Sequence, residues 1–140
     1  MSQLWLFSAQ TGNIRQMMIM NENMSHLDIN CSTEIDQTAL MLASARGFLE
    51  IVKFLIEIKA DIHHEDRYRE NALSLAVWNS HRDIAVLLYK LGSRIHEDIW
   101  EQMGEKETKL YEEIPRLIQW EKLRKFLIFS LSTRNSFKLI

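Results

Sequence analysis

The stretch TALMLASARGFLEIVKFLIEIKADIH, residues 38–63, returns further along the chain as NALSLAVWNSHRDIAVLLYKLGSRIH, residues 71–96. The two copies align without a gap at an offset of 33, so that Ile51 stands over Ile84 in the same register as all the other pairs. A fixed period of roughly this length is typical of solenoid proteins, in which each unit is one supersecondary element. The sequence therefore predicts a stack of similar units.

A third, less regular unit precedes these two. Residues 8–14 (SAQTGNI) match residues 43–49 (ASARGFL) 35 positions later, whereas Asp28 matches Asp61 at the shorter offset of 33. The first unit therefore carries two extra residues near positions 21–26. The predicted units span about residues 1–32, 33–65 and 66–98.

The apolar spacing within a unit predicts two short helices. In the second unit Gly47 ends the first helix, because glycine readily takes the left-handed conformation found at helix C-termini. The second helix begins near Leu49 and carries apolar residues at three-and-four spacing: Ile51, Val52, Leu55 and Ile56. Neither helix could bury its apolar face alone, so the units must stack into an all-α solenoid.

These residues resemble the ankyrin repeat, whose pattern is a turn, then T-P-L-H-x-A-A, then G-H-x-x-I-V-x-x-L-L, then G-A-D-V-N. The likeness runs from about Gln3 to His96. Other residues occupy the proline and glycine positions of the pattern: Ala39, Ala72, Asp36, Arg69 and Ser80. The resemblance implies an ankyrin-repeat solenoid of stacked helix-turn-helix units over residues 1–96. In its N-terminal cap, Trp5 and Phe7 are expected to take core leucine positions.

For function, the resemblance implies binding of another protein, without catalysis and without a cofactor. Partners of ankyrin arrays contact the concave face, which is built from the turn tips and the exposed ends of the first helices. Carried over position by position, the predicted partner-binding residues are Gln10, Thr11, Ile35, Gln37, Arg46, Arg67, Tyr68, Glu70, Trp78 and Asn79. Tyr68 and Trp78 are prominent because aromatic residues dominate interface energetics. The alternative for Trp78 is inward packing against a neighbouring helix or the C-terminal segment.

Beyond His96 the repeat pattern ends, and residues 97–140 are expected to form a helical cap or extension. Two residues of the N-cap type stand ahead of apolar positions: Asp98 and Thr108. Pro115 is expected to interrupt the helix, because proline lacks the amide hydrogen of the helical ladder. A final helix with a broad apolar stripe is expected from about Arg116 to Leu131.

The role of this extension is open at the level of sequence. Acidic residues dominate positions 97–113, and basic residues dominate from Ile114 onward. The stripe could cap the last repeat, dock into a partner protein, or lie on a membrane surface. Docking would use four residues: Trp120, Leu123, Phe126 and Leu127. The chain would then be a binding module, a structural subunit of a larger assembly, or an adaptor that recruits a partner through this helix.

Composition excludes several classes of protein. The formal net charge of −2 gives no general attraction to nucleic acid, so none is expected as a partner. The apolar run at residues 126–131 is far shorter than the roughly 20 residues of a membrane span. Cys31 is the one cysteine, and the N-terminus lacks the pattern of a secretion signal. We therefore expect an intracellular protein, cytoplasmic or nuclear.

Two groups of residues invite a chemical interpretation. The run His63-His64-Glu65-Asp66 has metal-binding residue types, but the phrase Ile-His-Glu-Asp recurs at residues 95–98. These histidines therefore occupy the asparagine position of the repeat, where side-chain hydrogen bonds hold the turn. Cys31 lies in a predicted turn without a neighbouring base or nucleophile motif. The sequence thus predicts neither a metal site nor a catalytic site.

Overall fold

The computed structural model describes the backbone of residues 1–136 and the side chains of residues 1–132. The last residues of the predicted extension, 137–140, lie outside the described residues. Within the described chain there are eight α-helices: α1 (Ser2–Thr11), α2 (Ile14–Asn23), α3 (Ala39–Arg46), α4 (Leu49–Glu57), α5 (Ala72–Trp78), α6 (Arg82–Lys90), α7 (Glu97–Trp100) and α8 (Glu105–Ser136). The predicted all-α class is confirmed.

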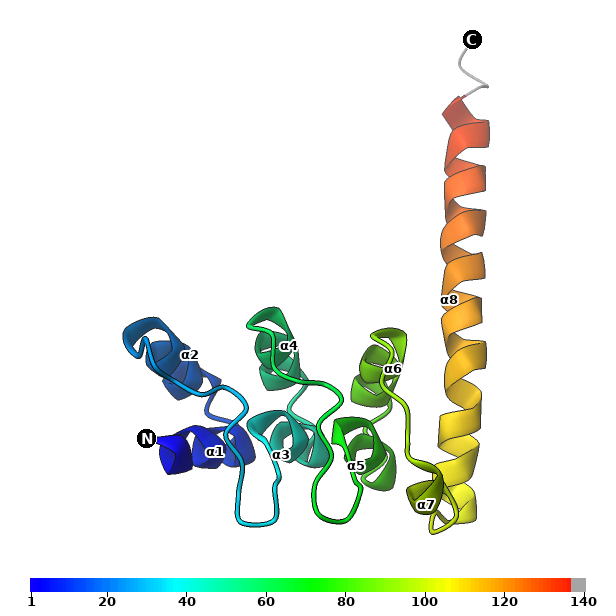
Figure 1. Cartoon of the computed structure of the whole chain (residues 1–140). Coiled ribbons are helices and arrows are strands. Elements are labelled where there is room, and N and C mark those ends of the chain that lie inside the picture. Colours follow the sequence, from blue (N-terminus) through cyan, green and yellow to red (C-terminus); the bar gives the residue numbers. More distant parts are fainter. Residues whose placement is uncertain (137–140) are drawn as a thin grey trace.

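The first six helices form two layers (Figure 1). Helices α1, α3 and α5 make one layer, and α2, α4 and α6 make the other, with the loops before α3 and α5 extending beyond the first layer. Neighbouring helices contact one another within each unit and from each unit to the next. One apolar core therefore runs through the stack, as expected when single units cannot bury their own faces.

The repeat positions act as helix caps. Thr38 and Asn71, at equivalent positions of successive units, are the N-caps of α3 and α5, and their side chains accept hydrogen bonds from backbone amides in the first turn. Ser74 completes a capping box with Asn71. Gly47 ends α3 with φ 81°, as predicted.

Residues other than glycine adopt the left-handed conformation at several glycine positions of the repeat. Asp36 (φ 66°) and Arg69 (φ 64°) do so in the turns before α3 and α5, and Ser80 (φ 61°) does so after α5. Ser80 is the counterpart of Gly47 one period later. Left-handed backbone costs a residue with a side chain roughly 1–2 kcal/mol. The backbone path of the repeat is thus retained at an energetic cost.

Of the two core positions predicted in the N-terminal unit, one is correct and one is wrong. Trp5 is fully buried, as expected, and its indole donates to the carbonyl oxygen of Ile29 at 3.3 Å. The expectation for Phe7 is wrong, because its side chain is 60% exposed. Helix α3, the equivalent of α1 in the second unit, packs between α1 and α5. Within the described chain, α1 packs against the first helix of another unit on one side only. The side occupied by Phe7 therefore lacks a covering repeat.

The C-terminal segment differs from its prediction at three residues. His96, not Asp98, is the N-cap of α7, and its ring Nδ1 accepts the amide of Asp98. Helix α8 begins at Glu105, so Thr108 lies in its first turn and donates its hydroxyl to carbonyl oxygens. Pro115 does not interrupt the helix, which continues to Ser136. Packing of neighbouring side chains on the repeats holds the helix through the proline, since Ile114 is fully buried.

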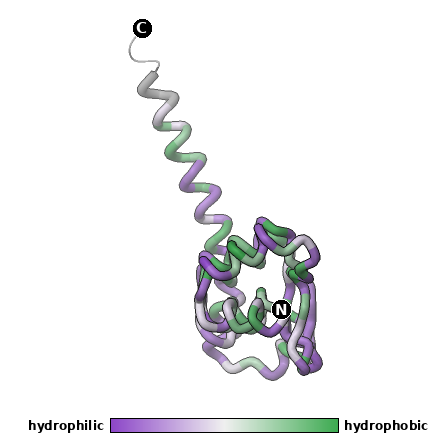
Figure 2. The backbone as a smooth tube through the Cα atoms, turned by 90° about the vertical axis from the view of Figure 1, so that its left-hand side faces the viewer, coloured by the Kyte–Doolittle hydropathy of each residue, from purple (hydrophilic) through white to green (hydrophobic). Residues whose placement is uncertain are grey.

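The two ends of α8 have different surroundings. Its first half packs against α5 and α6, whereas the second half borders α6 only along one groove and then projects beyond the stacked helices (Figures 1 and 2). Its buried and half-buried apolar residues all precede Gln119: Leu110, Tyr111, Ile114, Leu117 and Ile118. Among the described helices, none combines the length and apolar character needed to cross a bilayer.

Candidate protein-binding surface

The loops before α3 and α5 form two matching finger turns, residues 33–38 and 66–71. Thr33 and Asp66 begin these turns at equivalent positions of the repeat. The Thr33 hydroxyl accepts the amide of Gln37 at 3.1 Å, and the Asp66 carboxylate accepts the amides of Tyr68 and Glu70 at 2.8 and 3.1 Å. Each turn is therefore closed by the side chain of its own first residue.

The two finger turns are also bonded to one another. The Gln37 amide nitrogen donates to Asp66 Oδ2 at 3.2 Å, and Arg67 Nε donates to Asp36 Oδ2 at 3.1 Å. His64 Nε2 lies 2.7 Å from the carbonyl oxygen of Asp36, which accepts from it. The exposed Arg67–Asp36 ion pair contributes little to stability by itself. Together these bonds fix the distance between neighbouring fingers.

The predicted finger residues share one surface but differ in exposure. Tyr68 is 63% exposed and Ile35 is 37% exposed, while Arg67 is also exposed. Gln37 and Glu70 are partly buried, and burial together with the neighbouring Asp66 carboxylate raises the pKa of Glu70. Tyr68 and Ile35 are therefore the apolar side chains available at the finger tips.

The other predicted residues lie at the C-terminal ends of the first helices. Gln10, Thr11, Arg46 and Asn79 are at least partly exposed. Thr11 and Asn79 turn their side chains back to carbonyl oxygens of their own helices, each at 2.8 Å. Because the fingers precede these helices, the two sets lie at opposite ends of them, about 12 Å apart for the eight-residue α3. The predicted site is thus two parallel rows of residues.

Trp78, the last residue of α5, is partly buried and packs against the core. Its indole Nε1 is buried and has no hydrogen-bond partner within the part of the chain that the structure describes. An unsatisfied buried donor is costly, and a partner or a water molecule that accepted this bond would relieve the cost. Trp78 therefore combines a packing contact with an unused polar group.

Sequence reasoning missed the structural role of Asp66. Its side chain is buried and accepts three hydrogen bonds, two from its own turn and one from Gln37. In the sequence it ends the run His63-His64-Glu65-Asp66, whose residue types are also those of metal sites. The signal that could have identified it was its register with Thr33, a residue that commonly closes turns.

The residues considered for chemistry have ordinary surroundings. Burial raises the pKa of the Cys31 thiol, so that less of the nucleophilic thiolate is present at neutral pH. Within residues 1–132, no group of three or more histidine, cysteine or acidic side chains is arranged to hold a metal ion. His96, from the second Ile-His-Glu-Asp phrase, is bonded to Arg69 and to the amide of Asp98.

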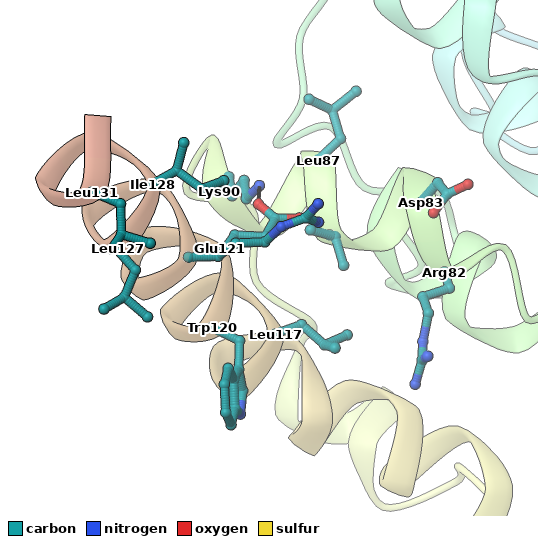
Figure 3. Close-up of a pocket in the computed structure, with 12 residues that line it drawn as sticks. Arg82, Asp83, Leu87, Lys90, Leu117, Trp120, Glu121, Leu127, Ile128 and Leu131 are labelled. Carbon is teal, nitrogen blue, oxygen red and sulfur yellow. Dashed lines mark hydrogen bonds and ion pairs between the residues drawn. The ribbon is translucent and has the colours of Figure 1, made fainter. Parts of the chain in front are cut away.

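A groove of about 690 Å³ runs between α6 and α8 (Figure 3). Two ion pairs bridge these helices, Arg82 with Glu113 and Lys90 with Glu121. The apolar residues of its walls are Val86, Leu87, Leu117, Trp120, Leu127, Ile128 and Leu131. The residues predicted for helix docking all lie on the half of α8 that projects beyond the repeats: Trp120, Leu123, Phe126 and Leu127.

A family model described as ankyrin repeats (3 copies) matches residues 6–99. The Notch-regulated ankyrin repeat-containing protein of Xenopus tropicalis is 31% identical over 83 residues, which are 58% of this chain and 73% of that protein. The Notch-regulated ankyrin repeat-containing protein A of Danio rerio is 31% identical over 94 residues, which are 62% of this chain and 84% of that protein. The E3 ubiquitin-protein ligase Ufd4 of Drosophila melanogaster is 37% identical over 67 residues, but these are only 2% of its length.

The match and the structure agree. The family model covers more than half of the chain, and the helices that it covers stack in pairs with the caps and turns that the repeat pattern requires. The resemblance stated from the sequence is confirmed. The chain belongs to the ankyrin-repeat family.

Proposed function

We propose that this chain binds a partner protein through the concave face formed by its two finger turns and the ends of its first helices. Ankyrin repeats are in general protein-interaction modules. The observation that carries the proposal is Tyr68, which is 63% exposed on a turn that buried Asp66 and the bonds to the first finger hold in place. A rigid, exposed aromatic side chain loses little conformational entropy on binding and is a common interface anchor.

The charged and polar residues of the proposed surface surround this anchor. Arg67 and Arg46 can donate paired hydrogen bonds to a partner carboxylate. Ile35 extends the apolar contact, and Gln37 and Glu70 line the base of the fingers. The second row is Gln10, Thr11, Trp78 and Asn79 at the helix ends. A partner that follows both rows would contact all three units.

The projecting half of α8 is the second part of the proposed function. We divide the chain into a repeat array, residues 1–96, and an extension, residues 97–140. Helix docking of the extension would use Trp120, Leu123, Phe126 and Leu127, which are exposed. Because these side chains need a covering partner, a structural subunit of a larger assembly or an adaptor is the alternative function. In each case we propose a non-enzymatic, intracellular role, in the cytoplasm or nucleus, without a cofactor.

The proposed concave surface is tested by affinity capture followed by direct titration. The intact chain, a Tyr68→Ala variant and a Tyr68→Ala/Trp78→Ala variant are used to capture proteins from an extract of the source organism. Each purified candidate is then titrated by calorimetry. We expect Tyr68→Ala to weaken binding by about 2 kcal/mol with little change in melting temperature. The added Trp78→Ala change in the double variant should weaken binding further and also lower the melting temperature, because the Trp78 side chain is partly buried.

The matched control is Phe7→Ala, which removes another exposed aromatic ring outside the proposed surface. This variant should bind as the wild type does. Equal binding by wild type and the Tyr68→Ala/Trp78→Ala variant would contradict the proposed concave surface.

A further inference from the structure

The distal segment of α8, residues 119–132, presents an exposed apolar surface. Its large side chains include Trp120, Leu123, Phe126, Leu127, Ile128 and Leu131, which are 49–70% exposed. Single exposed apolar residues are ordinary, but a contiguous patch of this kind marks an interaction site. If a partner covered these side chains, the area buried on this chain would be on the order of the roughly 800 Å² per partner of a specific interface.

The distal segment carries a stripe of apolar residues whose centre lies on the side of α8 away from the repeats. Leu123 lies at its centre, with Trp120, Phe126 and Leu127 at three-and-four spacing around it. The opposite face is the one held against α6, where Glu121 pairs with Lys90. The side chains of this apolar stripe are therefore exposed, and one edge of the stripe, at Trp120 and Leu127, borders the groove beside α6.

Cations flank the apolar stripe on both sides. Lys122 and Arg124 adjoin Leu123 in sequence, so helical geometry places them about 100° to either side of it. Neither forms an ion pair with another side chain among residues 1–132. The acid of this segment, Glu121, is already paired with Lys90. The exposed stripe therefore has positive borders and no acidic residue to neutralise them.

We propose that the distal segment binds an amphipathic helix of a partner protein that carries acidic residues on both sides of its own apolar stripe. This inference rests on the proposed function of the chain as a protein-binding module and names the partner chemistry of its second surface. Acidic borders would pair with Lys122 and Arg124, while the apolar stripes of the two helices pack together.

A second copy of this chain is a poor occupant on charge grounds. Two copies that pair symmetrically through Leu123 bring the Lys122 and Arg124 of one copy beside those of the other. Like charges opposite one another across an interface disfavour the complex. The distal segment alone holds no unpaired acid that could offset this repulsion.

The shape of the surface favours a helix over a flat membrane. The apolar stripe shares Trp120 and Leu127 with the groove between α8 and α6, where Val86 and Leu87 form the other wall (Figure 3). A rod-shaped occupant on the stripe can place one edge in this groove, whereas a bilayer surface cannot follow it. Arg124 lines the α8 side of the groove. The α6 side carries Asp83 and two cations, and both cations are already paired with acids of α8. Acidic residues of the occupant should therefore face α8.

The test is a selection for helical peptides on the intact protein. A displayed library of amphipathic helices of about 20 residues, roughly 30 Å long, carries apolar residues at three-and-four spacing and Glu, Gln or Lys at the border positions. Binders to a Leu123→Asp/Leu127→Asp variant are removed. We expect glutamate to be enriched at both borders. The enriched peptide should bind the wild type, by calorimetry, at least about tenfold more tightly than it binds a Lys122→Glu/Arg124→Glu variant.

Two matched controls accompany this titration. Arg15→Glu reverses an exposed arginine on α2, outside both proposed surfaces, and should leave binding within about twofold of wild type. Asp83→Asn removes the acid of the α6 wall and should not weaken binding. Circular dichroism checks the fold of each variant, and the shift in tryptophan fluorescence on peptide binding gives a second measurement.

Four results would overturn the inference: no peptide specific for the stripe, enrichment of lysine, equal enrichment of Glu, Gln and Lys, or binding that survives the Lys122→Glu/Arg124→Glu change. Dimerisation that the Leu123→Asp/Leu127→Asp variant abolishes would assign the surface to a second copy instead. Binding to phosphatidylcholine–phosphatidylserine vesicles without peptide binding would assign it to lipid. The finger variants leave α8 unchanged, so failure of the concave surface and failure of this inference are distinguishable.

Discussion

The two halves of α8 both carry large apolar residues, but these residues have opposite environments. Ile114 and Ile128 are separated by close to four helical turns and so point to similar sides of the helix. Ile114 is fully buried against the repeats, whereas Ile128 is 57% exposed. The difference arises because the stack of repeats ends beside the first half and leaves the second without a neighbour (Figure 1). An apolar residue on one helix can therefore serve stability or binding, depending only on where the stack ends.

The largest expected effect tests this contrast directly. Ile114→Ala should destabilise the protein by about 2–5 kcal/mol, because it removes a buried side chain and leaves a cavity. Ile128→Ala, the matched change in the distal half, should alter stability by less than about 0.5 kcal/mol. Urea unfolding measures both. Similar losses for the two variants would mean that the distal half is also packed in solution.

The second prediction concerns Pro115, which stands near the junction of the two halves. Its missing amide leaves the carbonyl oxygen of Tyr111 without a helical hydrogen bond. Pro115→Ala should therefore stabilise α8, by up to about 3 kcal/mol, and increase amide protection around the junction. Hydrogen exchange and urea unfolding are the measurements, with Gln119→Ala as the exposed control. A stability unchanged or lowered by Pro115→Ala would show that the proline conformation itself is required.

The third prediction, with a smaller effect, concerns two equivalent positions in the repeats and asks whether repeat stability affects binding by the distal half of α8. Ser80→Gly should stabilise the protein by about 0.5–1 kcal/mol, because glycine relieves the left-handed strain but gains freedom in the unfolded chain. Gly47→Ala, at the equivalent position, should destabilise it, since a Cβ there would lie 2.6 Å from the His81 ring. Thermal unfolding records both changes. A peptide selected to bind the distal segment should bind both folded variants equally. Unequal binding would show that the repeats and the distal segment are energetically coupled.

The smallest effects are two pH dependences of opposite sign. The hydrogen bond from Lys90 lowers the pKa of Glu121 below its ordinary value of 4.5, so this group stabilises the fold above that pH. The contribution is lost as the pH falls through the lowered pKa, so Glu121→Gln should be less stable than wild type at pH 7, and this difference should shrink at pH 3. Glu70 has a raised pKa, so stability present below 4.5 is lost as the pH rises through the raised pKa. Glu70→Gln should be the more stable protein at pH 7. Urea unfolding at both pH values tests the signs, and a difference that persists unchanged at pH 3 would contradict this assignment.

Much of the fold follows from local sequence. The register of the repeat is a local feature, and Gly47 ends α3 as its position predicts. Thr38 and Asn71, which begin the two copies of the repeat, cap α3 and α5 in the structure. The stacked all-α architecture follows from them because no single pair of helices can bury its apolar side chains. Family membership and the general class of function were accessible from the same residues.

The tertiary structure alone decided which apolar and polar residues are covered. Phe7 is exposed because no repeat covers its side of α1, and α8 continues through Pro115 because Ile114 is held against the repeats. Asp66 acts as the closing residue of a finger turn and also accepts a bond from Gln37, which belongs to the preceding unit. Sequence periodicity specifies which face of a helix is apolar, but burial depends on neighbours distant in the chain. For this reason the stripe on α8 and its basic neighbours could be predicted from the sequence, while the exposure of the stripe required the three-dimensional structure.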